Sequence, residues 1–138
     1  MSARAKARKR ALDFLYEGDI RGASAATLLA HRDAAELSPI SQGEYSESLI
    51  AGVLEHQAKI DELIMTYAQG WDMDRMPAID RNILRLAIYE ILWVNDVDDS
   101  VAISQAVELA NELSTEDSSG YINGLLGRIV ILKPSFVL

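Results

Sequence analysis

Apolar residues recur at spacings of three and four along most of this chain, and such spacing gathers them on one face of an α-helix. The clearest stripe consists of Ile79, Ile83, Leu84, Ala87, Ile88 and Ile91. Only 3 prolines interrupt the sequence, and no segment alternates apolar and polar residues convincingly, as a half-buried strand does. The sequence therefore predicts an all-α fold.

Glycine, proline and capping residues divide this pattern into six expected helices. In order, they are residues 3–17 before Gly18 and Gly22, residues 24–37 with Ser24 as N-cap, a long segment between Ser38-Pro39 and Gly70, one starting near Pro77, one capped by residues 98–100, and one after Ser118. We find no internal repeat and no linker of low complexity. A chain of 138 residues suits one core, so residues 1–138 are expected to form a single domain.

Three glycines share one face of the last expected helix. Gly120, Gly124 and Gly127 each cost about 1 kcal/mol of helix stability relative to alanine. That cost indicates close approach of another backbone, which is either a neighbouring helix or a partner molecule. We favour packing against a neighbouring helix.

The charge of the chain is divided unevenly. The net charge is −8, but the first ten residues carry +5 with no acid, which leaves −13 on the remainder. An acidic body repels nucleic acid, whereas a short basic arm attracts it locally, because 0.1 M salt screens charges beyond about 10 Å. We expect any nucleic-acid site at this arm, residues 1–10, which can be flexible when free.

The composition also excludes several classes of site. The chain has no cysteine, so it has no disulfide, thiol nucleophile or thiolate metal ligand. The basic N-terminus is not followed by an apolar stretch, and the longest hydrophobic runs are far shorter than a membrane span. We therefore expect a cytoplasmic protein without membrane association.

A cationic surface is expected on the first helix. On a helical wheel, Lys6, Lys9 and Arg10 lie opposite Ala7 and Ala11. Single-stranded RNA uses cations for its phosphates and an aromatic ring on which a base stacks for roughly 1 to 3 kcal/mol. Tyr16 falls near Lys9, while Arg4 and Arg8 continue the cationic surface toward the chain end. The alternative is a solvated helix face in which Lys9 pairs with Asp13.

Several motifs in the second half of the chain recur together in one protein family. They are Trp71-Asp72-Met73-Asp74-Arg75, the run from Ile79 to Glu90, Glu108-Leu109-Ala110, Glu116-Asp117-Ser118 and Tyr121-Ile122-Asn123-Gly124. Weaker similarity begins at Arg8-Lys9-Arg10-Ala11. In order and spacing, these motifs resemble the NusB transcription antitermination factors, and the resemblance covers most of the chain.

The resemblance implies a fold and a function. NusB proteins are all-helical, with about six or seven helices in two small packed bundles. They bind single-stranded boxA RNA of ribosomal leader transcripts together with NusE, a small-subunit ribosomal protein. As part of an RNA polymerase antitermination complex, they prevent early termination in ribosomal RNA operons. The resemblance implies no catalysis, no cofactor and no metal.

The resemblance also implies roles for individual residues. The basic positions of the arm, Tyr16 and Tyr121 match RNA contacts of the family, and Asp80 matches an acid on the side that faces NusE. Tyr121 also begins an apolar stripe, so a core position is an alternative, and Asp80 can be explained by a helix dipole. Many NusB sequences have a basic residue just before the aromatic, where this chain has Ser119-Gly120, which puts a phosphate contact of this loop in doubt.

Two other classes of function compete with this interpretation. An enzyme is disfavoured because His31 and His56 lie in separate helices, with no nucleophile or metal-ligand spacing. A protein-interaction module is the stronger alternative. In that case, the glycine-bearing face or the apolar tail 136–138 mediates self-association, which includes a homodimer, and RNA binding is weak or absent.

Overall fold

The structure is a computed structural model that describes residues 2–33 and 40–138, and within these ranges all regular secondary structure is helical. The predicted all-α fold is therefore confirmed. The elements are α1 (Ala3–Arg21), α2 (Ala25–Asp33), α3 (Ile40–Tyr67), the 3₁₀-helix η1 (Met73–Arg75), α4 (Ala78–Trp93), α5 (Asp99–Leu113), α6 (Glu116–Leu132) and the 3₁₀-helix η2 (Lys133–Ser135). None of the described helices is long and apolar enough to cross a membrane.

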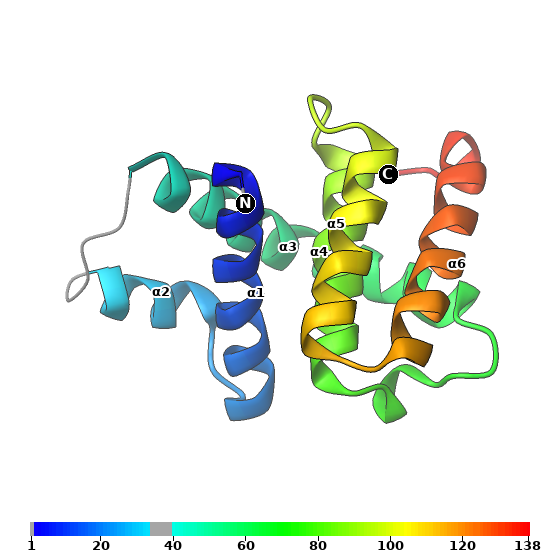
Figure 1. The fold of residues 1–138 in the computed structure, drawn as a ribbon, viewed down its shortest axis with the longest axis horizontal. Coiled ribbons are helices and arrows are strands. Elements are labelled where there is room, and N and C mark those ends of the chain that lie inside the picture. Colours follow the sequence, from blue (N-terminus) through cyan, green and yellow to red (C-terminus); the bar gives the residue numbers. More distant parts are fainter. Residues whose placement is uncertain (1, 34–39) are drawn as a thin grey trace.

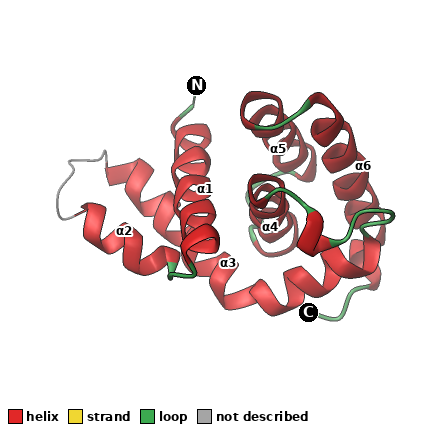
Figure 2. Cartoon of the chain, turned by 90° about the horizontal axis from the view of Figure 1, so that it is seen from below, coloured by secondary structure: helices red, strands yellow, loops and turns green. Residues whose placement is uncertain are grey.

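The helices form two small bundles, α1–α3 and α4–α6, as Figure 1 shows. The long helix α3 belongs to both, because it runs beneath α1 and α4 toward α6 (Figure 2). One apolar core continues through the two bundles. Its largest fully buried side chains are Leu12, Phe14, Leu49, Ile50, Ile60, Ile64, Ile83, Leu84, Ile88, Ile122, Leu126 and Ile129.

Most helix boundaries agree with the predicted segments, and two differences have clear causes. α1 continues past Gly18 to Arg21 and ends at Gly22, which adopts the left-handed conformation with φ of 67°. Gly18 permits a close approach instead of breaking the helix, since a Cβ there would lie 2.6 Å from the carbonyl oxygen of Ala23. α6 begins earlier than predicted, because the side chain of Thr115 caps it by accepting from the Ser118 N–H at 3.1 Å. The predicted end of the second helix at residue 37 lies outside the described residues.

The prediction that the α6 glycines pack against a neighbouring helix is wrong. A Cβ on Gly120, Gly124 or Gly127 would meet nothing within 4 Å. The close approach occurs in α3 instead, where the Tyr89 ring occupies the space that a Cβ on Gly52 would need. The three glycines of α6 therefore face open space in this structure.

A network of ion pairs joins the two bundles at the C-terminal end of α1. Asp19 accepts hydrogen bonds from Arg81 at 2.9 Å and from Arg85 at 3.2 Å. Arg85 also holds Asp61 of α3 through two hydrogen bonds of 2.8 and 3.1 Å. These acids separate two arginines that would otherwise repel each other along α4. Hydrogen bonds from Asn82 and Arg81 lower the pKa of Asp19, although burial, the largest single influence, acts to raise it.

Candidate nucleic-acid interface

The outer face of α1 carries the cations that the helical wheel predicts there. Ala7 and Ala11 are fully buried, whereas Lys6 is exposed and Lys9 and Arg10 are partly exposed. We call Lys6, Lys9 and Arg10 the basic strip. Tyr16 lies further along α1 and leaves 39% of its surface exposed. The basic strip belongs to a helix that already begins at Ala3, with Ser2 as its N-cap.

Arg8 does not belong to this exposed surface, and its predicted RNA contact is corrected here. It is only 4% exposed, and its Nε donates to both carboxylate oxygens of Glu90 in α4, at 2.8 and 3.0 Å. The Tyr45 hydroxyl donates to the same carboxylate. A buried arginine paired in this way is unavailable to a phosphate. Arg8 instead fixes α1 against α4.

The same network controls which face of α1 turns outward. Ser46 of α3 is buried and donates to the Ala7 carbonyl at 2.9 Å, next to the Arg8–Glu90 pair. Burial and the hydrogen bond to Glu90 raise the pKa of Tyr45, so its hydroxyl remains a donor even at alkaline pH. Because these contacts hold the inner side of α1, the basic strip lies on its outer side. Arg10 is at the edge of this strip, with its guanidinium 5.4 Å from the ring centroid of Phe14.

Two further ion pairs connect α1 to the C-terminal bundle at the surface. Arg4 lies 4.4 Å above the ring of Tyr45 and donates to Asp96 at 2.9 Å. Lys9 donates to Glu112 of α5, and this hydrogen bond is the largest cause of a raised pKa of Lys9. Exposed pairs of this kind contribute little to stability because water and salt screen them, so they open easily when a stronger partner arrives. Arg4 and Lys9 therefore remain usable as phosphate ligands.

Tyr121 lies elsewhere in the molecule. Its ring meets Trp71 edge-on, with 4.9 Å between centroids, and its hydroxyl donates to the Gln69 carbonyl at 3.3 Å. The ring is half-buried, and burial raises the pKa of its hydroxyl. Figure 2 shows α1 and α6 on opposite sides of α4, so Tyr16 and Tyr121 do not form one stacking platform.

A shallow hollow of about 280 Å³ lies beside Tyr121. Gly120 and Gly124 line it, together with Arg128, whose guanidinium lies 5.4 Å from the centroid of Tyr67. Sequence reasoning missed Arg128. Its distance of seven residues from Tyr121 would have placed both on one face of the helix. The hollow thus combines aromatic rings, a cation and glycine backbone that no side chain covers.

Asp80 is not a surface acid, and its predicted contact with a partner is corrected. It is fully buried, and its Oδ2 accepts from the Ser118 hydroxyl at 2.6 Å. Its Oδ1 is buried without a hydrogen-bond partner in the structure. Asp80 therefore joins the start of α4 to the start of α6, and Asp117 beside Ser118 is exposed. Within the described residues, no group of three or more His, Cys, Asp or Glu side chains could hold a metal ion.

Comparisons with known proteins agree with the resemblance seen in the sequence. The model of the NusB family matches residues 5–130. A transcription antitermination protein NusB from Nocardioides sp. (strain ATCC BAA-499 / JS614) is 51% identical over 135 residues, covering 98% of either chain. The solved structure of T. maritima NusB has a TM-score of 0.85 at 30% identity and covers 95% of this chain and 92% of that one. A chain from a crystal structure of the antitermination factors NusB and NusE in complex with dsRNA has a TM-score of 0.84 at 25% identity, covering 95% and 98%.

Proposed function

Because this chain belongs to the NusB family of antitermination factors, we propose that it binds single-stranded boxA RNA together with NusE and thereby promotes processive transcription of ribosomal RNA operons. Its place of action would then be the cytoplasm, within an RNA polymerase antitermination complex. The observation that carries the RNA-binding part is the basic strip, which an internal network turns toward solvent on an otherwise acidic protein.

We propose Arg4, Lys6, Lys9, Arg10 and Tyr16 as the RNA contacts on α1. The ammonium and guanidinium groups would neutralise phosphates, and the exposed ring of Tyr16 would stack on a splayed base. Tyr121 and its hollow on α6 are proposed as a separate contact on the other side of α4. A strand that uses both would have to cross the C-terminal bundle.

For the protein partner, we propose the acidic surface next to Asp80. A hollow of about 500 Å³ is lined by Met65, Ala68, Trp71, Asp72, Met73, Asp74 and Arg75, and Met65 is 63% exposed. Arg81 donates to the Met73 carbonyl at 3.1 Å, which fixes this loop to the start of α4. A basic ribosomal protein would be attracted by the two aspartates and could cover the exposed methionine.

Fluorescence anisotropy with a short labelled boxA RNA tests the proposal. The wild-type protein should bind boxA RNA more tightly than a scrambled RNA at the same salt concentration, and NusE should tighten the binding. If about 3 to 5 phosphates are contacted, log affinity should fall with log salt with a slope of roughly −2 to −3.5. Equal binding of both RNAs, with and without NusE, would contradict it.

A matched pair of variants locates the contact. The double variant Lys6→Ala, Lys9→Ala should weaken binding and flatten the salt slope by about 1.4, which corresponds to two lost phosphate contacts. The control Lys59→Ala, Lys133→Ala removes the same charge from α3 and η2. Affinity should remain near wild type in the control, because neither residue lies on α1. Equal losses in both variants would indicate only a long-range effect of net charge.

Self-association is a second candidate, supported by exposed apolar residues at the C-terminal end. Ile131, Val137 and Leu138 expose 78%, 87% and 58% of their surfaces. Light scattering with and without RNA distinguishes the candidates. A stable dimer that never dissociates on addition of RNA would favour the protein-interaction module, whereas a monomer that binds RNA would favour the antitermination factor.

A further inference from the structure

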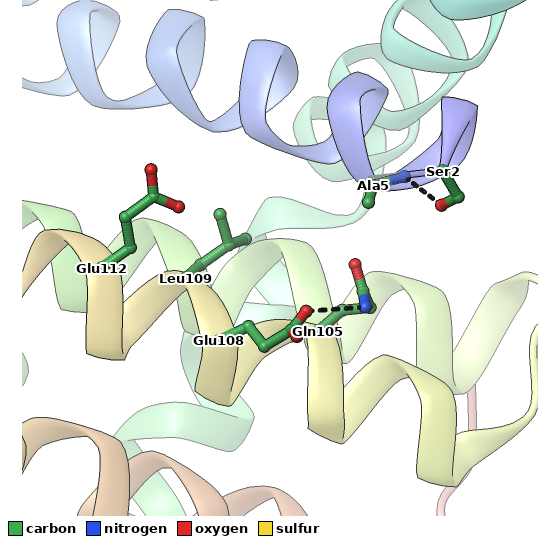
Figure 3. Close-up of a pocket in the computed structure, with 6 residues that line it drawn as sticks. All are labelled: Ser2, Ala5, Gln105, Glu108, Leu109 and Glu112. Atoms are coloured by element: carbon green, nitrogen blue, oxygen red, sulfur yellow. Dashed lines mark hydrogen bonds between the residues drawn. The ribbon is translucent and has the colours of Figure 1, made fainter.

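A groove of about 600 Å³ separates the first turns of α1 from α5. Figure 3 shows Ser2 and Ala5 on one wall and Gln105, Glu108, Leu109 and Glu112 on the other. Its volume falls in the range of small-molecule sites, about 300 to 1,000 Å³. None of the sequence patterns indicated it, because its two walls lie about a hundred residues apart in the chain.

The groove combines an apolar part with hydrogen-bond acceptors. Ala5 and Leu109 are both at most 9% exposed and present apolar surface. On the rim, Gln105 Nε2 donates to Glu108 Oε2 at 3.0 Å, which orients this pair, as Figure 3 shows. Glu112 reaches into the space between the helices from α5. A flat ligand with N–H groups along one edge suits such a site.

The groove opens directly onto the basic strip. Lys9 of the strip is hydrogen-bonded to Glu112 of the groove, and both side chains are substantially exposed, at 37% and 44%. A phosphate bound at Lys6 or Lys9 would therefore place its own nucleotide beside the groove. Single-stranded RNA is read through the Watson–Crick edges of its unstacked bases.

Guanine is the base whose edge matches these groups. It presents two neighbouring donors, N1–H and N2–H, beside the acceptor O6. The Glu112 carboxylate can accept from both donors at once, and the Lys9 ammonium beside it can donate to O6. Adenine and cytosine each offer one amino group on this edge, and uracil offers one imide N–H, so none fills both carboxylate oxygens in this way.

We propose that the groove between α1 and α5 is a base-reading subsite that binds a guanine of single-stranded RNA, with Glu112 as the residue that determines specificity. This inference rests on the proposed RNA-binding function and extends it from phosphate binding to base selection. Glu112 accepts from the guanine N1–H and N2–H, Lys9 turns from Glu112 toward O6 or the phosphate, and Leu109 contacts the base.

A rival explanation assigns the groove acids a purely repulsive role toward phosphate. The two explanations differ in one measurable way. If Glu112 only repels RNA, the variant Glu112→Gln should bind every RNA more tightly and keep any base preference. If Glu112 reads guanine, the same variant should lose that preference, because a glutamine side chain offers only one acceptor oxygen.

The experiment measures affinities for boxA RNA and for versions in which each guanosine in turn is replaced by inosine, which lacks only the N2 amino group. At one position, the wild-type protein should bind the guanosine RNA about tenfold more tightly, as expected for one lost hydrogen bond to a charged group. In Glu112→Gln this ratio should approach one. The control Glu62→Gln removes another surface acid that pairs with a lysine, Lys59 on α3, and it should keep the wild-type ratio.

Each possible result either supports or overturns the guanine-binding subsite. RNA binding by the wild type without any guanosine preference overturns the inference and leaves the proposed function intact. A preference that persists in Glu112→Gln, or that disappears equally in Glu62→Gln, also overturns it. If the wild type binds no RNA, the proposed function fails and this inference fails with it. Loss of the preference in Glu112→Gln alone supports the subsite.

Discussion

The first turns of α1 and the helix α6 are held by different forces. In the first turns of α1, the buried apolar residues are the small Ala5, Ala7 and Ala11, and the charged Arg8–Glu90 pair provides the specific attachment. α6 instead buries large apolar side chains, namely Ile122, Leu125, Leu126 and Ile129. Burial of alanine contributes little, because hydrophobic stabilisation scales with apolar area. The second half of α1 does bury Leu12, Phe14 and Leu15, but its first turns, which carry the basic strip, are positioned mainly by a few polar contacts that single substitutions can remove.

The strongest test of this difference is the substitution Glu90→Ala. It leaves Arg8 buried without its partner, so the free energy of unfolding should fall by about 3–5 kcal/mol. Urea denaturation measures this loss. As a control, Glu55→Ala removes an exposed acid of α3 and should change stability by less than about 0.5 kcal/mol. A loss below about 1 kcal/mol in Glu90→Ala would mean that the apolar contacts alone hold α1.

The burial of Arg8 could have been predicted from the sequence, but its partner could not. On a helical wheel, Arg8 falls between Leu15 and Leu12, on the buried side of α1. Its place in a run of basic residues suggested the opposite. Glu90 follows Arg8 by 82 positions, and only the packing of α1 against α4 brings the two together. Local periodicity therefore predicts which face is buried, and tertiary packing decides which charges meet.

The difference between local periodicity and tertiary packing also explains which other sequence-based predictions were right and which were wrong. Helix positions were largely predictable, because spacing and capping are local properties of the chain. Asp80 was correctly placed in the first turn of α4, but its burial depends on Ser118 of a distant helix. The glycines of α6 were recognised as unusual, yet the sequence does not reveal which surface lies beside them. The groove between α1 and α5 has no local signal at all.

Ser118→Ala tests the polar contact that α6 makes despite its apolar packing. The substitution removes the donor to Asp80 Oδ2, and Oδ1 already lacks a partner, so the carboxylate becomes fully unsatisfied. We expect a loss of about 1–3 kcal/mol of stability in urea denaturation. Ser119→Ala is the matched control, since that hydroxyl is bonded only to the Glu116 carbonyl at the surface. Similar losses in both variants would refute a special role of the Asp80–Ser118 contact.

Asp19→Asn tests how the two bundles are joined, through the pH dependence of stability. The folded-state pKa of Asp19 lies below its ordinary value of 3.8. The ionised carboxylate therefore stabilises the fold fully at pH values above the unfolded-state pKa, and this stabilisation disappears as pH falls through the folded-state pKa. Above about pH 5, the free energy of unfolding of the wild type should exceed that of Asp19→Asn by about 1–2 kcal/mol. The difference should shrink steadily below about pH 4. A difference that is constant from pH 7 to pH 3 would contradict an ionic role of Asp19.

Gly124→Ala produces the smallest expected change and separates folding from binding in α6. A Cβ there meets nothing within 4 Å, so alanine should raise the free energy of unfolding by about 1 kcal/mol through its higher helix propensity.

Gly124 also lines the hollow beside Tyr121 and Arg128. If RNA approaches the backbone at this hollow, the more stable variant should bind boxA RNA more weakly, because the new methyl group occupies that space. Unchanged affinity would place the hollow outside the RNA path, and RNA binding would then depend on α1 alone. Reduced stability would contradict the open space beside this glycine. Higher stability with weaker RNA binding would show that the glycine is retained for contact with a ligand at the expense of the helix itself.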